Sequence, residues 1–197
     1  MAWTKVGPAN IFLLYALGEA ARAIAAFDEA LRLSHIVHER QPGVQALELK
    51  SVLDQLRLGI SASASVSRVF WPAFNRNTED LERAKARAVR LRELCRIPPQ
   101  HALKDRTLRD AVDHFDERLD AWVGDAPRPY LTDQTVAHPL TVNKAEYLSE
   151  AALLVYDVAN NEVLILGRRL SIIKTTEGLE DICALISKAL VSLDWDD

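Results

Sequence analysis

The residues best suited to chemistry in this sequence lie within six positions of one another: Arg109, Asp110 and His114. Arg109 carries a permanent positive charge and a planar set of donors that fits a phosphate. His114 can exchange a proton near neutral pH. In a metal-independent cleavage of RNA, His114 would take the proton of a 2′-hydroxyl, that oxygen would attack the adjacent phosphate, and Arg109 would stabilise the charge on the phosphoryl oxygens. Asp110, four residues before His114, is placed to hold the imidazole.

A helix must position these side chains, and the sequence predicts one from about Leu103 to Gly124. The apolar residues of this stretch recur at helical spacing. They form one stripe, which we expect to be buried: Leu108, Ala111, Val112, Phe115, Leu119 and Trp122. Arg109 and His114 lie off that stripe, about 140° apart around the axis, and can still converge on one small anion.

The same charges have a second explanation, as ion pairs on a solvated helix face. Arg109 with Asp113, and Arg106 with Asp110, have the i, i+4 spacing that stabilises a helix. The acidic residues of this stretch would also repel a nucleic-acid backbone. The sequence leaves both explanations open.

The Arg–His spacing resembles the motif of the HEPN superfamily, in which an arginine, often followed by a polar residue, shortly precedes a histidine. The match is Arg109-Asp110-Ala111-Val112-Asp113-His114 on the fourth predicted helix, and the resemblance covers roughly residues 9–124. It implies a helical bundle with Arg109, Asp110 and His114 as catalytic residues.

Many HEPN proteins are metal-independent ribonucleases of toxin–antitoxin or antiviral systems. They form homodimers in which two motifs share one cleft, whereas other members only bind. The resemblance therefore implies an endoribonuclease with RNA as its substrate, a homodimer, an antitoxin-like protein as partner, and neither cofactor nor metal. The alternative is a non-catalytic module that dimerises or binds a partner.

Other candidate sites are weaker. Two further Arg–His pairs have a comparable spacing, but neither arginine is followed by an acid: Arg32 with His38, and Arg96 with His101. A metal candidate consists of His35 and His38, with Glu39 nearby, within one helical turn, but a third ligand is not evident. No serine has the spacing of a nucleophile elbow.

We predict a mainly α protein, a HEPN-like bundle of four to five helices followed by a β-hairpin and a closing helix. Residues 1–124 form the bundle, and residues 125–197 form a loop, the hairpin and the last helix, packed on the bundle. The bundle helices are expected at residues 11–38, 44–70, 78–95 and 103–124. Trp71-Pro72 ends the second, and Thr78 caps the third.

The second part contains two β-rich runs around a turn, Asn160-Asn161. We expect a loop at 125–141, a short helix at 144–151, strands at 153–157 and 163–166, a third strand or ordered loop at 170–173, and a helix at 178–193. That last helix presents an apolar stripe containing Cys183, which we expect to be a core residue.

The first and second predicted helices each carry a pattern that predicts how they pack. The first helix is expected to bury one apolar face, with Asp28 in its middle: Leu13, Leu14, Leu17, Ala21, Ile24, Ala25 and Leu31. The small residues from Ser61 to Ser67 favour a tight helix crossing. They also motivate the homodimer.

Charge is unevenly spread along the 197 residues. The net charge is −4, yet residues 83–109 hold nine basic residues against two acidic ones, a local charge of +7 against −11 elsewhere. This stretch could hold phosphates or form a solvated face.

The distant cysteines, Cys95 and Cys183, indicate a reducing compartment. The apolar run Ile11–Leu17 is too short for a bilayer, so we predict a cytoplasmic protein without a membrane partner.

Overall fold

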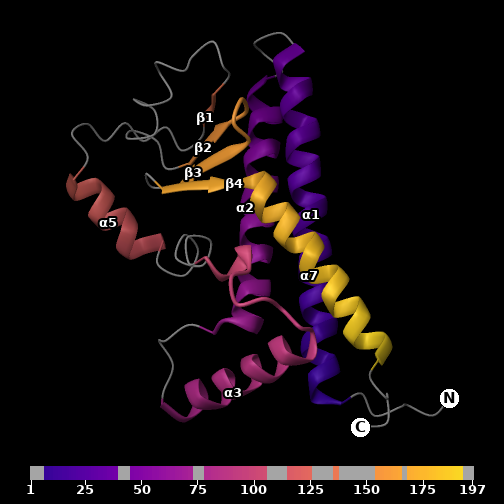
Figure 1. Ribbon diagram of the computed structural model, residues 1–197. Coiled ribbons are helices and arrows are strands. Elements are labelled where there is room, and N and C mark those ends of the chain that lie inside the picture. The colour runs from indigo at the N-terminus through magenta and orange to yellow at the C-terminus, as the bar shows by residue number, and fades with distance from the viewer. Residues whose placement is uncertain are drawn as a thin grey trace, which may run out of the picture.

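The computed structural model describes residues 7–39, 45–72, 78–105, 115–125, 135–137, 154–165 and 168–192. The protein is mainly helical, with a small antiparallel sheet and a helix after it, which confirms the predicted fold class (Figure 1). The helices are α1 (Pro8–Glu39), α2 (Gln45–Phe70), α3 (Thr78–Leu94), the short 3₁₀ helix η1 (Ala102–Lys104), α5 (Phe115–Asp125) and α7 (Ile172–Ser192).

The ends of α2 and α3 lie where the sequence predicts them. α2 ends at Phe70, because Pro72 pushes Trp71 out of helical geometry. α3 begins at Thr78, and two acidic residues of its first turn, Glu79 and Asp80, lie at the positive end of the helix dipole.

The predicted face of α1 is only partly confirmed. Leu13 is fully buried and Leu17, Ile24 and Leu31 pack half-buried against the core, but Leu14, Ala21 and Ala25 are exposed. Leu14 is 43% exposed, whereas Phe27 and four alanines are fully buried: Ala16, Ala20, Ala23 and Ala30. Asp28 is exposed and therefore needs no partner. Small side chains let the backbone of α2 approach closely, and this gain in packing outweighs the burial of a leucine.

α2 also contributes small residues to its contact with α1. Gly59 lies directly against Phe27, and a Cβ built on Gly59 would stand 2.6 Å from the phenyl ring. Ser63 is fully buried and its hydroxyl donates to the carbonyl of Gly59, 2.7 Å away. The predicted tight crossing is therefore an internal contact between α1 and α2, which places this part of the small-residue tract inside a single chain.

The sheet has the order β1-β2-β3-β4. Strands β2 (Leu154–Asp157), β3 (Glu162–Ile165) and β4 (Arg168–Ser171) are antiparallel, while the three-residue β1 (Thr135–Ala137) pairs with β2 in parallel. The predicted hairpin is confirmed, and the third run forms a strand. The loop expected at 125–141 is wrong in one respect, since it contributes β1. The short helix expected at 144–151 lies outside the described residues.

α7 starts six residues earlier than predicted, because Ser171 caps it. The Ser171 hydroxyl accepts from the backbone N–H of Lys174 at 3.3 Å, as an N-cap side chain does. Gly178 lies inside the helix, where a Cβ would stand 3.2 Å from the Cβ of Ala102 in η1. It therefore marks a close contact and not a helix start.

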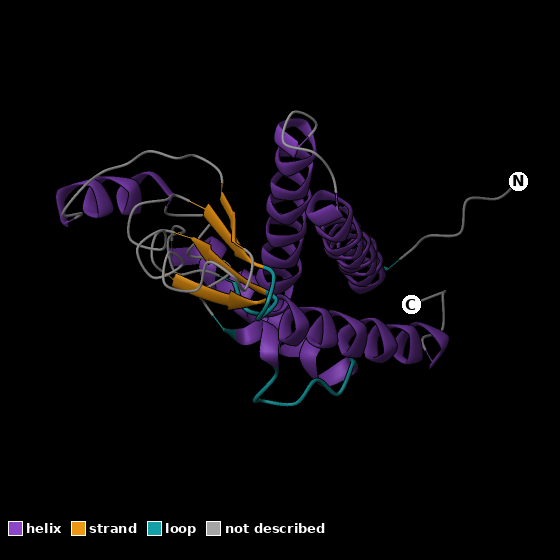
Figure 2. Ribbon diagram, turned by 90° about the horizontal axis from the view of Figure 1, so that it is seen from above, coloured by secondary structure: helices purple, strands orange, loops and turns teal. Residues whose placement is uncertain are grey.

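The sheet lies on the α2 side of the α1–α2 pair, and α7 leads away from it along α1 (Figures 1 and 2). The predicted stripe of α7 is buried at Leu179, Ile182, Ile186 and Leu190, and Cys183 is half-buried. By length and hydropathy alone, Pro8–His35 is apolar enough to cross a membrane. In the fold its alanine face is part of the core.

Substitution of Gly59 tests the α1–α2 contact. Gly59→Ala should lower the free energy of unfolding by about 1–2 kcal/mol, because the strain of overpacking against Phe27 exceeds the gain in helix propensity. Gly18→Ala is the matched control in α1, where a Cβ meets nothing within 4 Å. It should raise stability by about 0.5–1 kcal/mol in the same denaturation experiment. Equal stabilisation by both substitutions would contradict the contact.

Candidate functional site

The residues predicted to be catalytic lie outside the described residues. Arg109, Asp110 and His114 belong to 106–114, as do three members of the predicted stripe. In α5, Leu119 is half-buried, and Glu117 and Asp120 are exposed, as expected of a stripe with a polar opposite face. The Arg–His site remains a prediction.

The predicted helix does not begin at Leu103. His101 caps η1, since its Nδ1 accepts the backbone N–H of Leu103 at 3.2 Å. At Asp105 the backbone becomes extended, with ψ 130°, and the helical path ends there. The next described helix is α5, from Phe115 to Asp125.

His101 is buried at a junction of three elements. Its ring stacks on Trp71 with centroids 5.6 Å apart, and its Nε2 lies 3.4 Å from Oδ2 of Asp181 in α7. Because Nδ1 is an acceptor, the neutral ring carries its proton on Nε2, facing Asp181. Burial lowers the pKa of His101, and Asp181 opposes this effect in part. His101 thus holds η1 between α2 and α7, and replacing it by alanine would not be a neutral control for activity.

Among the described residues, no group of three metal-ligating side chains lies together. The side chains of His38 and Glu39 lie outside the described part, so the candidate at His35 stays a prediction. The thiols are poorly suited to nucleophilic chemistry, since burial raises the pKa of Cys95 to about 11 and raises that of Cys183.

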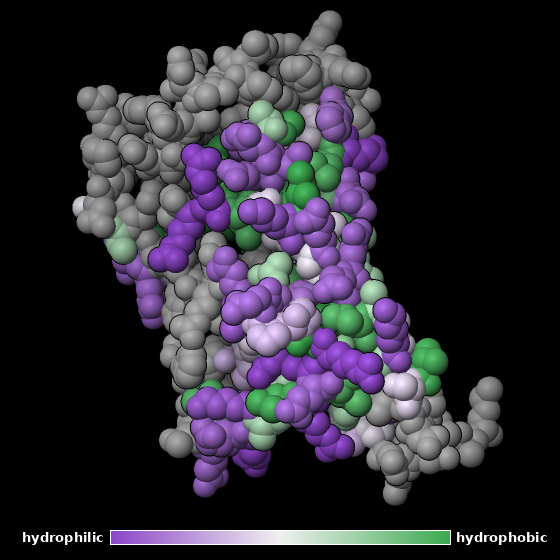
Figure 3. Space-filling model, in the orientation of Figure 1, coloured by the Kyte–Doolittle hydropathy of each residue, from purple (hydrophilic) through white to green (hydrophobic). Residues whose placement is uncertain are grey.

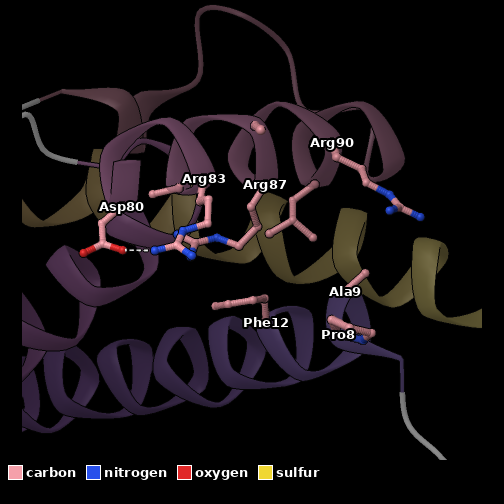
Figure 4. A pocket seen from close by; sticks show the side chains of 10 residues that line it. Pro8, Ala9, Phe12, Asp80, Arg83, Arg87 and Arg90 are labelled. Carbon is pink, nitrogen blue, oxygen red and sulfur yellow. Dashed lines mark hydrogen bonds and ion pairs between the residues drawn. The ribbon is translucent and has the colours of Figure 1, made fainter. Parts of the chain in front are cut away.

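A groove of about 920 Å³ lies between the start of α1 and one face of α3 (Figure 4). We call it the arginine groove. Its α1 side consists of Pro8, Ala9 and Phe12. Its α3 side consists of Asp80, Arg83, Ala84, Ala86, Arg87, Arg90 and Leu91.

The three arginines of the groove differ in how firmly they are held. Arg83 pairs with Asp80 at 2.5 Å, and Arg87 lies over the ring of Phe12, 4.3 Å from its centroid. Arg90 is exposed and makes no ion pair with the described residues. Figure 4 shows the side chains of Arg83 and Arg87 ending on the same side as Asp80, while Arg90 is directed away from them, so the three guanidinium groups do not converge on one point.

Three positive charges face one carboxylate in the groove, which leaves it at +2. The first turn of α1, which forms its other wall, holds no acidic residue. The positive end of the α1 dipole therefore adds to the field of the arginines. Figure 3 shows hydrophilic and hydrophobic side chains interleaved on this lower part of the molecule.

The other basic residues of α3 have structural partners. Arg92 donates from Nη1 to the carbonyl of Phe70, which ties α3 to the end of α2. Lys85 pairs with Glu82 at 2.8 Å. The basic stretch recognised in the sequence therefore divides into residues that hold the fold and a row that faces α1.

The sequence shows the positive charge of this stretch but not the surface of α1 that lies opposite it. Arg83, Arg87 and Arg90 are spaced at i, i+4 and i+7 in α3, and this spacing indicates that they share one face of the helix. That this face meets Phe12 is a tertiary fact. Comparison with family models, with curated proteins and with solved structures found no match.

The environment of His101 predicts a dependence of stability on pH. Because its pKa is lower in the folded state, the unfolded chain binds more protons below about pH 6.5, and the free energy of unfolding should fall as the pH decreases through that range. Urea denaturation between pH 7.5 and 5 measures this. His101→Asn retains a capping oxygen and should weaken the dependence. The control His35→Asn, on exposed α1 surface, should retain it; identical pH profiles for wild type and His101→Asn would refute the assignment.

Proposed function

We propose that the protein binds single-stranded RNA through the arginine groove. The observation that supports this is the row of Arg83, Arg87 and Arg90 opposite an aromatic residue, Phe12. Proteins that bind single strands combine a positive groove that follows the backbone with planar groups on which bases stack. The guanidinium plane of Arg87 is itself such a group.

A row of charges suits a repeated anion better than a single phosphate. Arg83 and Arg90 are seven residues apart, about 10 Å along the axis of α3. This is room for a few nucleotides. The partly exposed Pro8, Ala9 and Phe12 of α1 offer an apolar surface for bases, which a free inorganic anion would not use.

The negative charge of the rest of the chain limits how much of a nucleic acid the protein can contact. Outside residues 83–109 the sequence carries −11, which repels an extended polyanion. We therefore expect a short contact, sensitive to salt, and not a broad surface for duplex nucleic acid. This proposal differs from the predicted binding alternative, because it places the contact on α3 and α1 and not on the helix of Arg109 and His114.

The salt dependence of binding tests the groove. With two or three phosphates neutralised, the affinity for a labelled oligouridylate should fall with a slope of about −1.4 to −2 in log K against log salt. Arg90→Ala should reduce the affinity about fivefold at low salt and make the slope shallower by about 0.7. Fluorescence anisotropy between 20 and 200 mM salt measures both.

Arg57→Ala is the matched control, since Arg57 is exposed on α2 and outside the groove. It removes the same charge and should change affinity and slope little. If Arg57→Ala and Arg90→Ala had equal effects, the binding would be a response to net charge. No binding of any single-stranded oligonucleotide at 20 mM salt would overturn the proposal.

Cleavage of the bound RNA is the second proposal. The HEPN-like motif supports it, and the groove would supply the affinity for substrate that the motif by itself does not explain. The residues proposed to act are Arg109 as phosphate clamp, His114 as proton-transfer group and Asp110 as the residue that orients it. A shared site in a homodimer, and an antitoxin-like protein as its inhibitor, belong to the same proposal.

Arg109→Ala and His114→Ala should each reduce cleavage of an RNA pool at least 100-fold, because a clamp or a proton-transfer group is lost. Both variants should still bind the oligouridylate, and EDTA should leave the rate unchanged. Gel analysis of a mixed RNA pool measures cleavage, with Arg57→Ala as control. If the wild-type protein bound RNA but never cleaved it, the proposal of catalysis would be wrong and the proposal of RNA binding would stand.

A further inference from the structure

We infer that two copies of this chain pair through the exposed side of α1, in antiparallel orientation and with the two-fold axis at Gly18. The surface, which we call the α1 stripe, consists of exposed residues of this one helix: Ile11, Leu14, Tyr15, Gly18, Ala21, Arg22 and Ala25. None of them lines the arginine groove, so pairing and RNA binding use different surfaces. The inference depends neither on RNA binding nor on the Arg109–His114 site.

The α1 stripe is an apolar surface that its own chain does not cover. Ile11 is 58% exposed, Leu14 43% and Tyr15 51%, whereas the opposite side of α1 is part of the core. Figure 2 shows α2 and α7 beside α1, and no other described element on the side of α1 that is turned away from both. Large apolar side chains gathered on one open helix face mark a place where another surface docks.

The residues of the α1 stripe have the spacing of a helix that pairs with another helix. They form three rows with a period of seven residues, as in a coiled coil. The rows are a central one of Ile11, Gly18 and Ala25, a flank of Leu14 and Ala21, and a second flank of Tyr15 and Arg22. In each row a large residue stands near the start of α1, and the two apolar rows continue with small residues. The stripe thus has a large half and a small half, with Gly18 between them.

Gly18 is the residue of the stripe that a single chain does not explain. A glycine inside a helix is unfavourable relative to alanine, and a Cβ at Gly18 would meet nothing within 4 Å. Gly59, in contrast, lies directly against Phe27. A second backbone that crosses at Gly18 would give this glycine the same role that Gly59 has in the contact between α1 and α2.

The large and small halves fit one another only in an antiparallel pair. With the axis at Gly18, Ile11 comes level with Ala25 of the second copy, and Leu14 lies against Ala21 on the same flank. A parallel pair would set large residues against each other and hold the small halves apart. A lipid surface would favour large apolar residues along the whole stripe. The pattern therefore fits a second copy of this chain.

Charge favours the same orientation. On the other flank Tyr15 lies against Arg22 of the second copy, and a guanidinium over an aromatic ring is a favourable contact. Glu19 holds Arg22 at 2.9 Å and so limits the freedom that Arg22 would lose on pairing. The antiparallel pair also brings Asp28 to the level of the other α1 start, where the helix dipole is positive and the first turn has no acidic residue.

The size of the α1 stripe sets the strength of the pair. Three half-exposed large side chains offer roughly 100 Å² each. This is less than the ~800 Å² per partner of a standard interface. We therefore expect a weak dimer with a Kd in the micromolar range, which sedimentation velocity detects over a hundredfold range of concentration that reaches about 200 μM.

The first experiment compares two substitutions by sedimentation velocity. Leu14→Glu should weaken association at least tenfold, because it buries a carboxylate against Ala21 of the second copy. Leu58→Glu is the matched control, since Leu58 is also 43% exposed but lies on α2, outside the stripe. It should leave association unchanged. Equal effects of the two substitutions, or a wild-type protein that is monomeric at the highest concentration, would overturn the inference.

The second experiment tests the register by oxidative cross-linking. Gly18→Cys should give a disulfide-linked dimer, because the axis brings the two α-carbons of this position to about the 4.4–6.8 Å that a disulfide requires. Ile11→Cys is the control, because its two copies would lie about 21 Å apart along the helices. The wild type, whose Cys95 is buried and Cys183 half-buried, gives the background. Equal cross-linking of both variants, or none in Gly18→Cys, would contradict the antiparallel pair.

The remaining measurements separate this inference from its rivals. Arg90→Ala, which should weaken RNA binding, should leave association unchanged, so the dimer and the RNA proposal can fail separately. Vesicles of phosphatidylcholine and phosphatidylglycerol test the membrane alternative by co-sedimentation. If the wild type bound them as a monomer and Leu14→Glu did not, the stripe would be a lipid-binding surface and the inference would be wrong.

Discussion

The close approach of α1 and α2 is the constraint on which the rest of the structure depends. A glycine, buried serines and a row of alanines bring the two backbones together around Phe27. Dispersion contacts at this density are individually weak and collectively large, so they fix the rotation of α1 about its axis. That rotation decides which side chains of α1 remain outside the core, Phe12 at the groove and the exposed Ile11 and Tyr15 among them.

The junction at His101 is the second fixed point. Its neutral ring holds η1 against Trp71, while Ser67 donates from α2 to the carbonyl of Leu103 at 2.7 Å. Gly178 lets η1 approach α7 from the other side. The segment that leads toward residues 106–114 is therefore anchored at its beginning on two helices. Wherever Arg109 and His114 lie, their chain departs from a rigid place.

The arginine groove arises from the same packing. Arg92 ties α3 to the end of α2, and this contact directs the remaining arginines of α3 toward the start of α1. A protein with a net charge of −4 thus concentrates positive charge at one place.

The sequence by itself determined the helical class, the ends of α2 and α3, the β-hairpin and the buried stripe of α7. These depend on local signals, namely a proline, a capping threonine, an Asn-Asn turn and a regular apolar period. It also located the basic stretch that contains Arg83, Arg87 and Arg90. Tertiary structure decided the face of α1, since whether an alanine or Leu14 is buried depends on how closely α2 approaches. It likewise decided the start of α7 and the role of His101, because the close contact at Gly178 and the burial of the His101 ring are made by segments distant in sequence. The meeting of α3 with Phe12 was decided in the same way, for a charge pattern on one helix does not specify which surface lies across from it.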